Sequence, residues 1–84
     1  MYDYYFTFRS VTAALGASRA LERAGVPSVT VRTPKELRHQ GCGYSIRVRE
    51  ALLPDAGRAL ETAGAAYQKL YRRAENGAWQ EVPA

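Results

Sequence analysis

Tyr2-Asp3-Tyr4-Tyr5-Phe6-Thr7-Phe8 is the stretch that decides the fold. It is rich in aromatic and β-branched residues, which are enriched in β-strands. Because successive side chains of a strand point to opposite faces, Tyr4, Phe6 and Phe8 share one face and the residues between them share the other. Both faces are then apolar, and we expect this stretch to be the central strand of a sheet.

Two segments farther along the chain have the pattern of helices. From Val11 to Ala24, alanine and leucine recur at steps of three or four residues, and Gly25 follows as the residue that ends the helix. A second helix opens at Pro54 and Asp55, because proline and an acidic residue both suit a first helical turn. Gly64 ends this second helix in the same way.

Three further strands are expected at residues 29–33, 44–49 and 66–71, where β-branched and aromatic residues recur. The order is therefore β-α-β-β-α-β, a ferredoxin-like α+β arrangement: a four-stranded antiparallel sheet with two helices on one face and the other face open. We assign residues 1–74 to this single domain. Glu75-Asn76-Gly77 contains the Asn-Gly pair favoured in tight hairpins, so residues 75–84 form either a C-terminal hairpin with a fifth edge strand or a loose tail.

Length and composition limit the class of protein. At 84 residues the chain is large enough for one core but too small for two lobes around a deep cleft, so we do not expect an enzyme that needs a large enclosed pocket. Apolar residues make up 46% and charged residues 24% of the chain, as in an ordinary globular domain. No apolar run approaches the ~20 residues of a membrane span, and the first residues lack a leader pattern. We therefore expect a cytoplasmic protein without a membrane partner.

The segment His39-Gln40-Gly41-Cys42-Gly43-Tyr44 contains the only histidine and the only cysteine of the sequence. A single cysteine cannot form an internal disulfide, and together with His39 it supplies at best half of a metal site, so we expect no metal and no cofactor. Gly41 and Gly43 let a partner approach the sulfur closely. Cys42 also stands where a polar loop enters a strand, which suits a reactive thiol. The alternative is a buried small residue at the start of that strand.

Positive charge is concentrated around this cysteine. The chain has a net charge of +4, and Glu36 is the only acidic residue among the basic ones of the central loop and its flanking strands: Arg32, Lys35, Arg38, Arg47 and Arg49. The thiolate is the form that attacks sulfur or selenium, and nearby cations lower the pKa of a thiol. Arg38, Arg47 and a protonated His39 are therefore candidates for stabilising the thiolate. The alternative is a solvated basic surface.

A set of short motifs resembles the small bacterial family of selenium/sulfur carrier-like proteins: Pro34-Lys35-Glu36-Leu37, Cys42-Gly43, Ser45-Ile46-Arg47, Thr7-Phe8 and Ala24-Gly25-Val26-Pro27. The resemblance extends from Tyr4 to Tyr71. It implies a carrier, not an enzyme, in which a cysteine holds sulfur or selenium as a persulfide-type adduct and passes it to an acceptor enzyme. The implied partners are chalcogen donor and acceptor proteins. Carried over by position, the carrier cysteine is Cys42, the glycine after it is Gly43 and the arginine is Arg47.

The sequence departs from the family within the same loop. Lys35 follows Pro34 where the family usually has arginine, and Arg38-His39-Gln40-Gly41 stands where small serine-type residues are expected. The loop is also about one residue longer than the family pattern. These differences concern the loop residues that position the Cys42 thiol and expose it to a partner.

The residues leave two other functions open. The open sheet face or a free strand edge could bind another chain or a second copy of this one, which would make the protein an interaction or regulatory module or a homodimer. An open aromatic sheet face is also the RNA-recognition platform, and Gly43 to Val48 is vaguely similar to its third-strand signature. However, Ile46 and Val48 occupy the positions of its stacking rings, and the aromatic residues of the first strand fit a core better. We therefore do not expect a nucleic acid partner.

Overall fold

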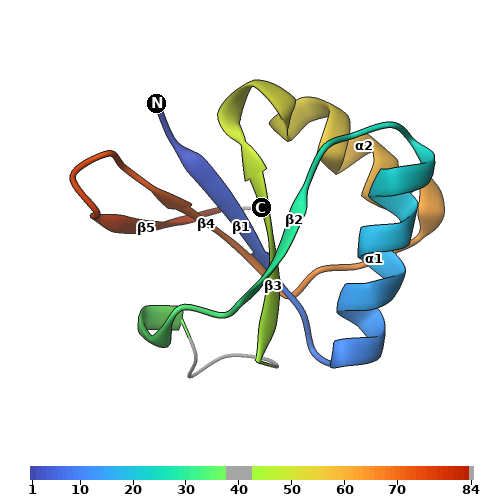
Figure 1. Cartoon of the computed structure of the whole chain (residues 1–84), viewed down its shortest axis with the longest axis horizontal. Coiled ribbons are helices and arrows are strands. Elements are labelled where there is room, and N and C mark those ends of the chain that lie inside the picture. Colours follow the sequence, from blue (N-terminus) through green and yellow to red (C-terminus); the bar gives the residue numbers. More distant parts are fainter. Residues whose placement is uncertain (38–42, 84) are drawn as a thin grey trace.

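The computed structural model describes residues 1–37 and 43–83 of the chain. Within them the strands are β1 (Asp3–Thr7), β2 (Val29–Arg32), β3 (Tyr44–Arg49), β4 (Lys69–Arg73) and β5 (Trp79–Val82). The helices are α1 (Val11–Arg23) and α2 (Leu53–Ala63), with short 3-10 helices η1 (Lys35–Leu37) and η2 (Glu50–Leu52). The paired strands are antiparallel in the order β2-β3-β1-β4-β5, and both α-helices lie on one side of the sheet (Figure 1). The described part of the chain is an α+β fold.

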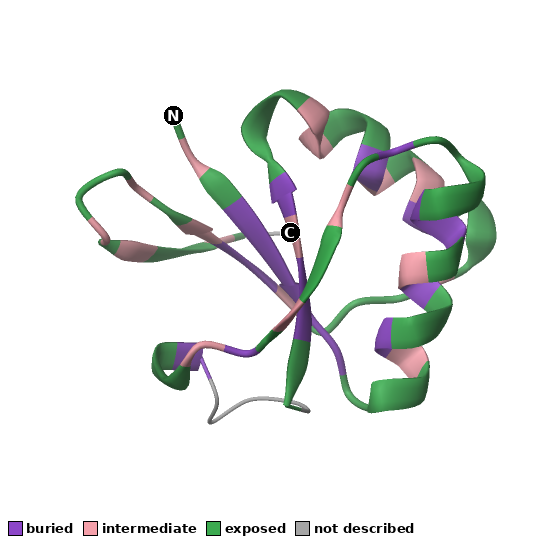
Figure 2. Cartoon of the chain, in the orientation of Figure 1, coloured by how far each residue is buried: buried purple, intermediate pink, exposed green. Residues whose placement is uncertain are grey.

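β1 is the central strand, as its sequence predicts. It pairs with β3 on one side and with β4 on the other. Tyr4, Phe6 and Phe8 belong to the core between the sheet and the helices, and each is at most 7% exposed. Tyr5, on the opposite face, is 5% exposed. Both faces of this strand are therefore buried, as Figure 2 shows by colour.

Both helices end at the glycines that the sequence predicts. The Ser10 hydroxyl caps the start of α1 by accepting a hydrogen bond from Ala13 N at 3.1 Å. Gly25 follows α1 at φ 72° and Gly64 follows α2 at φ 67°, in the left-handed region that favours glycine. Pro54 lies in the first turn of α2, where no backbone donor is needed. Among the described residues, no helix is long and apolar enough to cross a membrane.

Within the described residues a fifth strand extends the sheet, so the predicted four-stranded ferredoxin-like arrangement is only partly matched. The cause is the turn at Gly77, which has φ 88° and donates its N–H to Ala74 O at 2.9 Å. This turn brings β5 back alongside β4 as an edge strand. Glu75 in the same turn accepts a hydrogen bond from the Met1 amino group at 3.0 Å, which raises the pKa of that amino group.

β4 begins at Lys69, whereas the sequence pattern places its start at Ala66. The residues before Lys69 form a connection because tertiary contacts hold them. Ala65 N donates into the last turn of α2 at 2.9 Å. The Tyr67 ring packs edge-on against Phe6, with 4.8 Å between ring centroids. The prediction was therefore wrong at this boundary.

The sheet face turned away from the helices is called the outer sheet face here and is centred on Tyr5, Arg47 and Tyr71. The stretch from Pro34 to Gly41 has no sustained apolar pattern, which predicts a loop, but residues 35–37 form η1. The Leu37 side chain packs into a cluster with Tyr5 and Tyr71. Leu37 is only 2% exposed. The expectation of a fully open face is therefore corrected, because η1 covers its centre.

Candidate functional site

The structure describes part of the predicted site. Four of its residues lie outside the described ones: Arg38, His39, Gly41 and Cys42. Gly43 is described and exposed, and it directly precedes β3. Arg47 lies within β3. The described residues therefore define where the connection between β2 and β3, which contains Cys42 in the sequence, begins and ends.

The two ends of this connection are held together by hydrogen bonds. Thr33 N donates to Gly43 O at 2.8 Å, which continues the pairing of β2 and β3 beyond the strands. The hydroxyl oxygens of Thr33 and Ser45 lie 2.7 Å apart, and both residues are 0% exposed. Separating the pair breaks a hydrogen bond between two buried groups, which costs free energy. The residue that follows Cys42 therefore has a fixed backbone position.

The sequence analysis missed this hydroxyl pair. The pair follows from the strand register, which places Ser45 opposite Val31 and so brings Thr33 into reach, and no local pattern contains that register. Leu37 had a clearer signal. It is the only large apolar residue between Val31 and Tyr44, and a lone leucine in a polar segment indicates an anchor to the core.

Arg47 lies on the outer sheet face, opposite Tyr5 across the β1–β3 pair. It is half-buried, and no carboxylate of the described residues forms an ion pair with it. Along an extended strand, the separation between Gly43 and Arg47 is ~13 Å. Arg47 therefore adds to the positive potential around Gly43 over this distance, and a direct contact would require its side chain to reach back along β3.

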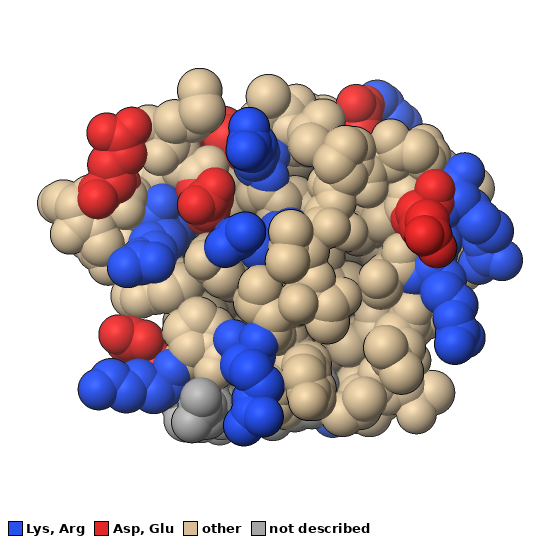
Figure 3. Space-filling view, in the orientation of Figure 1, with Lys and Arg blue, Asp and Glu red and all other residues tan. Residues whose placement is uncertain are grey.

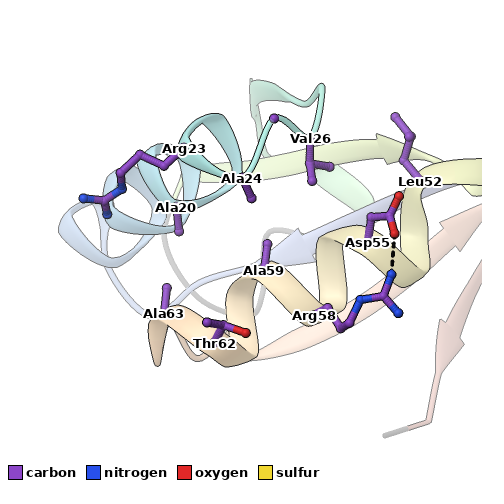
Figure 4. Close-up of a pocket in the computed structure, with 11 residues that line it drawn as sticks. Ala20, Arg23, Ala24, Val26, Leu52, Asp55, Arg58, Ala59, Thr62 and Ala63 are labelled. Atoms are coloured by element: carbon purple, nitrogen blue, oxygen red, sulfur yellow. Dashed lines mark hydrogen bonds and ion pairs between the residues drawn. The ribbon is translucent and has the colours of Figure 1, made fainter.

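A groove between α1 and α2 lies away from η1 and offers different chemistry (Figures 1 and 4). Small side chains such as Ala20 and Ala59 line it, together with the ion pair of Asp55 and Arg58 at 2.5 Å. None of its lining residues is cysteine or histidine. In the described part of the chain, no group of three or more His, Cys, Asp and Glu could hold a metal ion. This groove therefore lacks the thiol and the imidazole that the sequence analysis singles out.

The aromatic residues of β1 and the adjacent Phe8 are not available for stacking on a nucleic acid. Tyr4, Phe6 and Phe8 are buried beneath the helices, and Tyr5 is buried on the outer sheet face. Recognition of single-stranded nucleic acid by stacking needs exposed rings. The expectation that the aromatic residues of β1 belong to the core is confirmed.

The structure is therefore that of a small α+β domain, and the only cysteine of its sequence belongs to the connection between the antiparallel strands β2 and β3. The chain belongs to the family described as "Putative Se/S carrier protein-like", whose sequence model matches residues 3–72. The resemblance inferred from the sequence is confirmed at the level of the family, and the roles of the individual motif residues stay predictions. No curated protein and no solved structure matches the chain at a significant level.

Proposed function

We propose that this protein is a sulfur or selenium carrier that holds the chalcogen on Cys42 as a persulfide-type adduct and delivers it to an acceptor enzyme. The observation that carries the proposal is the family membership over residues 3–72, a range that includes the only cysteine of the sequence. The protein is not itself an enzyme in this proposal, because donor and acceptor proteins supply the catalysis. A cytoplasmic location suits this role, since thiols are kept reduced there.

Loading is an exchange reaction at sulfur. The Cys42 thiolate attacks the terminal sulfur of a donor persulfide, so that a new S–S bond forms on Cys42 and the S–S bond of the donor breaks. The donor leaves as a thiolate, and the proton stays on the transferred sulfur. That sulfur keeps its oxidation state, so no external oxidant or reductant is needed. Unloading repeats the exchange with the acceptor, and selenium follows the same bond changes.

The neighbours of Cys42 supply access and charge. Gly43 is exposed, and Gly41 gives a comparable lack of side-chain hindrance on the other side in sequence. Arg38 and a protonated His39, close to Cys42 in the sequence, favour the thiolate, and Arg47 adds positive potential from farther along β3. The hydrogen bond from Thr33 N to Gly43 O supports the proposal, because it holds the residue that follows Cys42 in the sequence against the end of β2.

The test is the pH dependence of Cys42 alkylation by a small thiol reagent, together with the intact mass after exposure to a persulfide donor. We expect half-maximal reaction well below the ~8.5 of an ordinary cysteine. We also expect a mass gain of one sulfur that Cys42→Ser abolishes. Arg47→Gln should raise the pH of half-maximal reaction, whereas the control Arg49→Gln, farther along the same strand face, should shift it less.

A thiol that reacts only in denaturant would contradict the carrier function and make Cys42 a core residue. The second candidate function would then take its place, a non-enzymatic interaction module. The observation that favours this second candidate is the gathering of arginine residues on the outer sheet face.

A further inference from the structure

The net positive charge of the chain comes from the residues of its strands. Within the described strands, six Lys and Arg residues stand against two Asp and Glu residues. In α1 and α2, three basic and three acidic residues cancel. The excess in the strands therefore equals the whole net charge of +4.

Half of this excess lies on the outer sheet face, where four basic residues stand against two acidic ones: Arg47, Arg49, Lys69 and Arg73 against Asp3 and Glu81. Arg49 and Arg73 stand on either side of Asp3 in the strand register, and Arg47 follows in the next row of the same face. No carboxylate of the described residues forms an ion pair with any of these arginines. A single aspartate therefore stands among three guanidinium groups.

The remainder of the face adds aromatic surface and no compensating charge. Glu81 is already paired with Lys69 at 3.4 Å. The half-buried Trp79 ring packs edge-on against Tyr5 with 4.8 Å between centroids, and the Arg73 guanidinium carbon lies 5.6 Å from the centroid of the Trp79 ring. Tryptophan, tyrosine and arginine are the residue types that dominate the energetics of protein interfaces. In Figure 3, Lys and Arg side chains lie over the strands together with several Asp and Glu side chains, and further Lys and Arg side chains lie over the helices.

We propose that the outer sheet face docks an acidic surface of the protein that exchanges sulfur or selenium with Cys42. This inference rests on the proposed function and adds the chemistry of the partner. Arg49 lies at the end of β3 away from Gly43, ~20 Å along an extended strand. A standard interface covers about 800 Å² of each partner, a patch roughly 30 Å across. A partner bound at these arginines can therefore also reach the connection that contains Cys42.

A protein fits this face better than a nucleic acid does. Stacking needs several exposed rings, whereas Tyr5 and Tyr71 are buried with Leu37, and the half-buried Trp79 beside Arg73 is the remaining aromatic ring among the described residues of this face. Complementary charge speeds association without requiring tight binding. That combination suits a carrier, which must bind and release its donor and its acceptor in turn.

The test is the binding of a fluorophore-labelled, glutamate-rich synthetic peptide to the full chain, measured by anisotropy at low ionic strength. A glutamine version of the peptide and an oligouridylate of equal net charge are the comparison ligands. We expect the glutamate peptide to bind best, and the variant Arg49→Gln/Arg73→Gln to weaken its binding by about fivefold or more. The matched control Arg19→Gln/Arg23→Gln removes the same charge from α1 and should weaken binding by less than about twofold.

Equal weakening in the two double variants would overturn the docking surface, since net charge alone would explain the binding. Tighter binding of the oligouridylate, lost with the same arginines, would overturn the choice of partner and indicate a nucleic acid site. Cys42→Ser separates this proposal from the carrier function, because peptide binding should persist in it although sulfur loading is lost. A wild-type chain that loads sulfur but shows no preference for the glutamate peptide overturns the docking surface alone. A chain that binds the peptide but never loads sulfur overturns the carrier function.

Discussion

The described part of this chain has a buried pair and an exposed pair of hydrogen-bonded hydroxyl groups, so the contributions of the two pairs to the free energy of unfolding can be compared. The buried pair lies where the connection that contains Cys42 joins β2 and β3. Thr33 Oγ1 and Ser45 Oγ lie 2.7 Å apart in the interior, whereas Thr30 Oγ1 donates to Ser18 Oγ at 3.4 Å on the surface. Ser45→Ala removes the hydrogen bond between these two buried hydroxyls, and such a bond typically contributes about 0.5–1.5 kcal/mol. We expect urea denaturation to show a loss of ~0.5–1.5 kcal/mol in the free energy of unfolding for Ser45→Ala. The control Ser18→Ala should change it by less than about 0.5 kcal/mol.

Ser45→Ala and Ser18→Ala also test whether the hydrogen bond between Thr33 and Ser45 helps to position the thiol of Cys42. Ser45→Ala loosens the strand that begins next to Gly43, so the alkylation rate of Cys42 under native conditions should change. Ser18→Ala should leave that rate at the wild-type value. Equal losses of stability in the two variants would contradict the role of burial at Ser45. Equal alkylation rates would mean that the hydrogen bond between Thr33 and Ser45 does not help to position the thiol.

At the scale of elements, the sequence predicts those boundaries that local chemistry sets. The helices end at Gly25 and Gly64 because glycine adopts positive φ at little cost, and this signal is visible without any tertiary structure. The start of β4 depends instead on a tertiary contact, the packing of the Tyr67 ring against Phe6. The existence of η1 likewise depends on the packing of Leu37 against Tyr5 and Tyr71. For the candidate site, the sequence likewise predicts a cysteine in a loop, while the hydroxyl pair at the base of that loop depends on strand register.

The β4–β5 hairpin depends on a glycine whose backbone other residues avoid. Gly77 has φ 88°, and the left-handed region costs an L-residue about 1–2 kcal/mol. Gly16 in α1 offers the opposite case, because a Cβ added there meets no atom within 4 Å and alanine is the better helix former. We expect Gly77→Ala to lower the free energy of unfolding by ~1 kcal/mol and Gly16→Ala to raise it by up to ~1 kcal/mol. Hydrogen exchange should also show weaker protection of the β5 amides in Gly77→Ala, and a gain of stability in both variants would contradict this account of the turn.

The whole molecule has apolar clusters on both faces of its central strand. Phe6 and Leu60 belong to the cluster between the sheet and the helices, and Tyr5 and Leu37 belong to the cluster on the outer sheet face. Because β1 contributes side chains to both clusters, neither cluster can lose its order without disturbing the strand that supports the other. We therefore expect the chain to unfold in one cooperative transition, as small single domains usually do.

Leu37→Ala and Leu60→Ala compare the two clusters with the same substitution at the same exposure, 2% in each case. Truncating a buried leucine costs about 2–5 kcal/mol, against a total stability of roughly 4–13 kcal/mol for a chain of this length. We expect a loss of ~3–5 kcal/mol for Leu60→Ala and ~2–3 kcal/mol for Leu37→Ala, because the outer cluster is smaller and its neighbours can close part of the cavity. Urea denaturation should show lower midpoints with an unchanged slope in both variants. An unchanged midpoint in Leu37→Ala would mean that η1 does not close the outer sheet face, and the surface available to an acidic partner would then extend over Tyr5 and Tyr71.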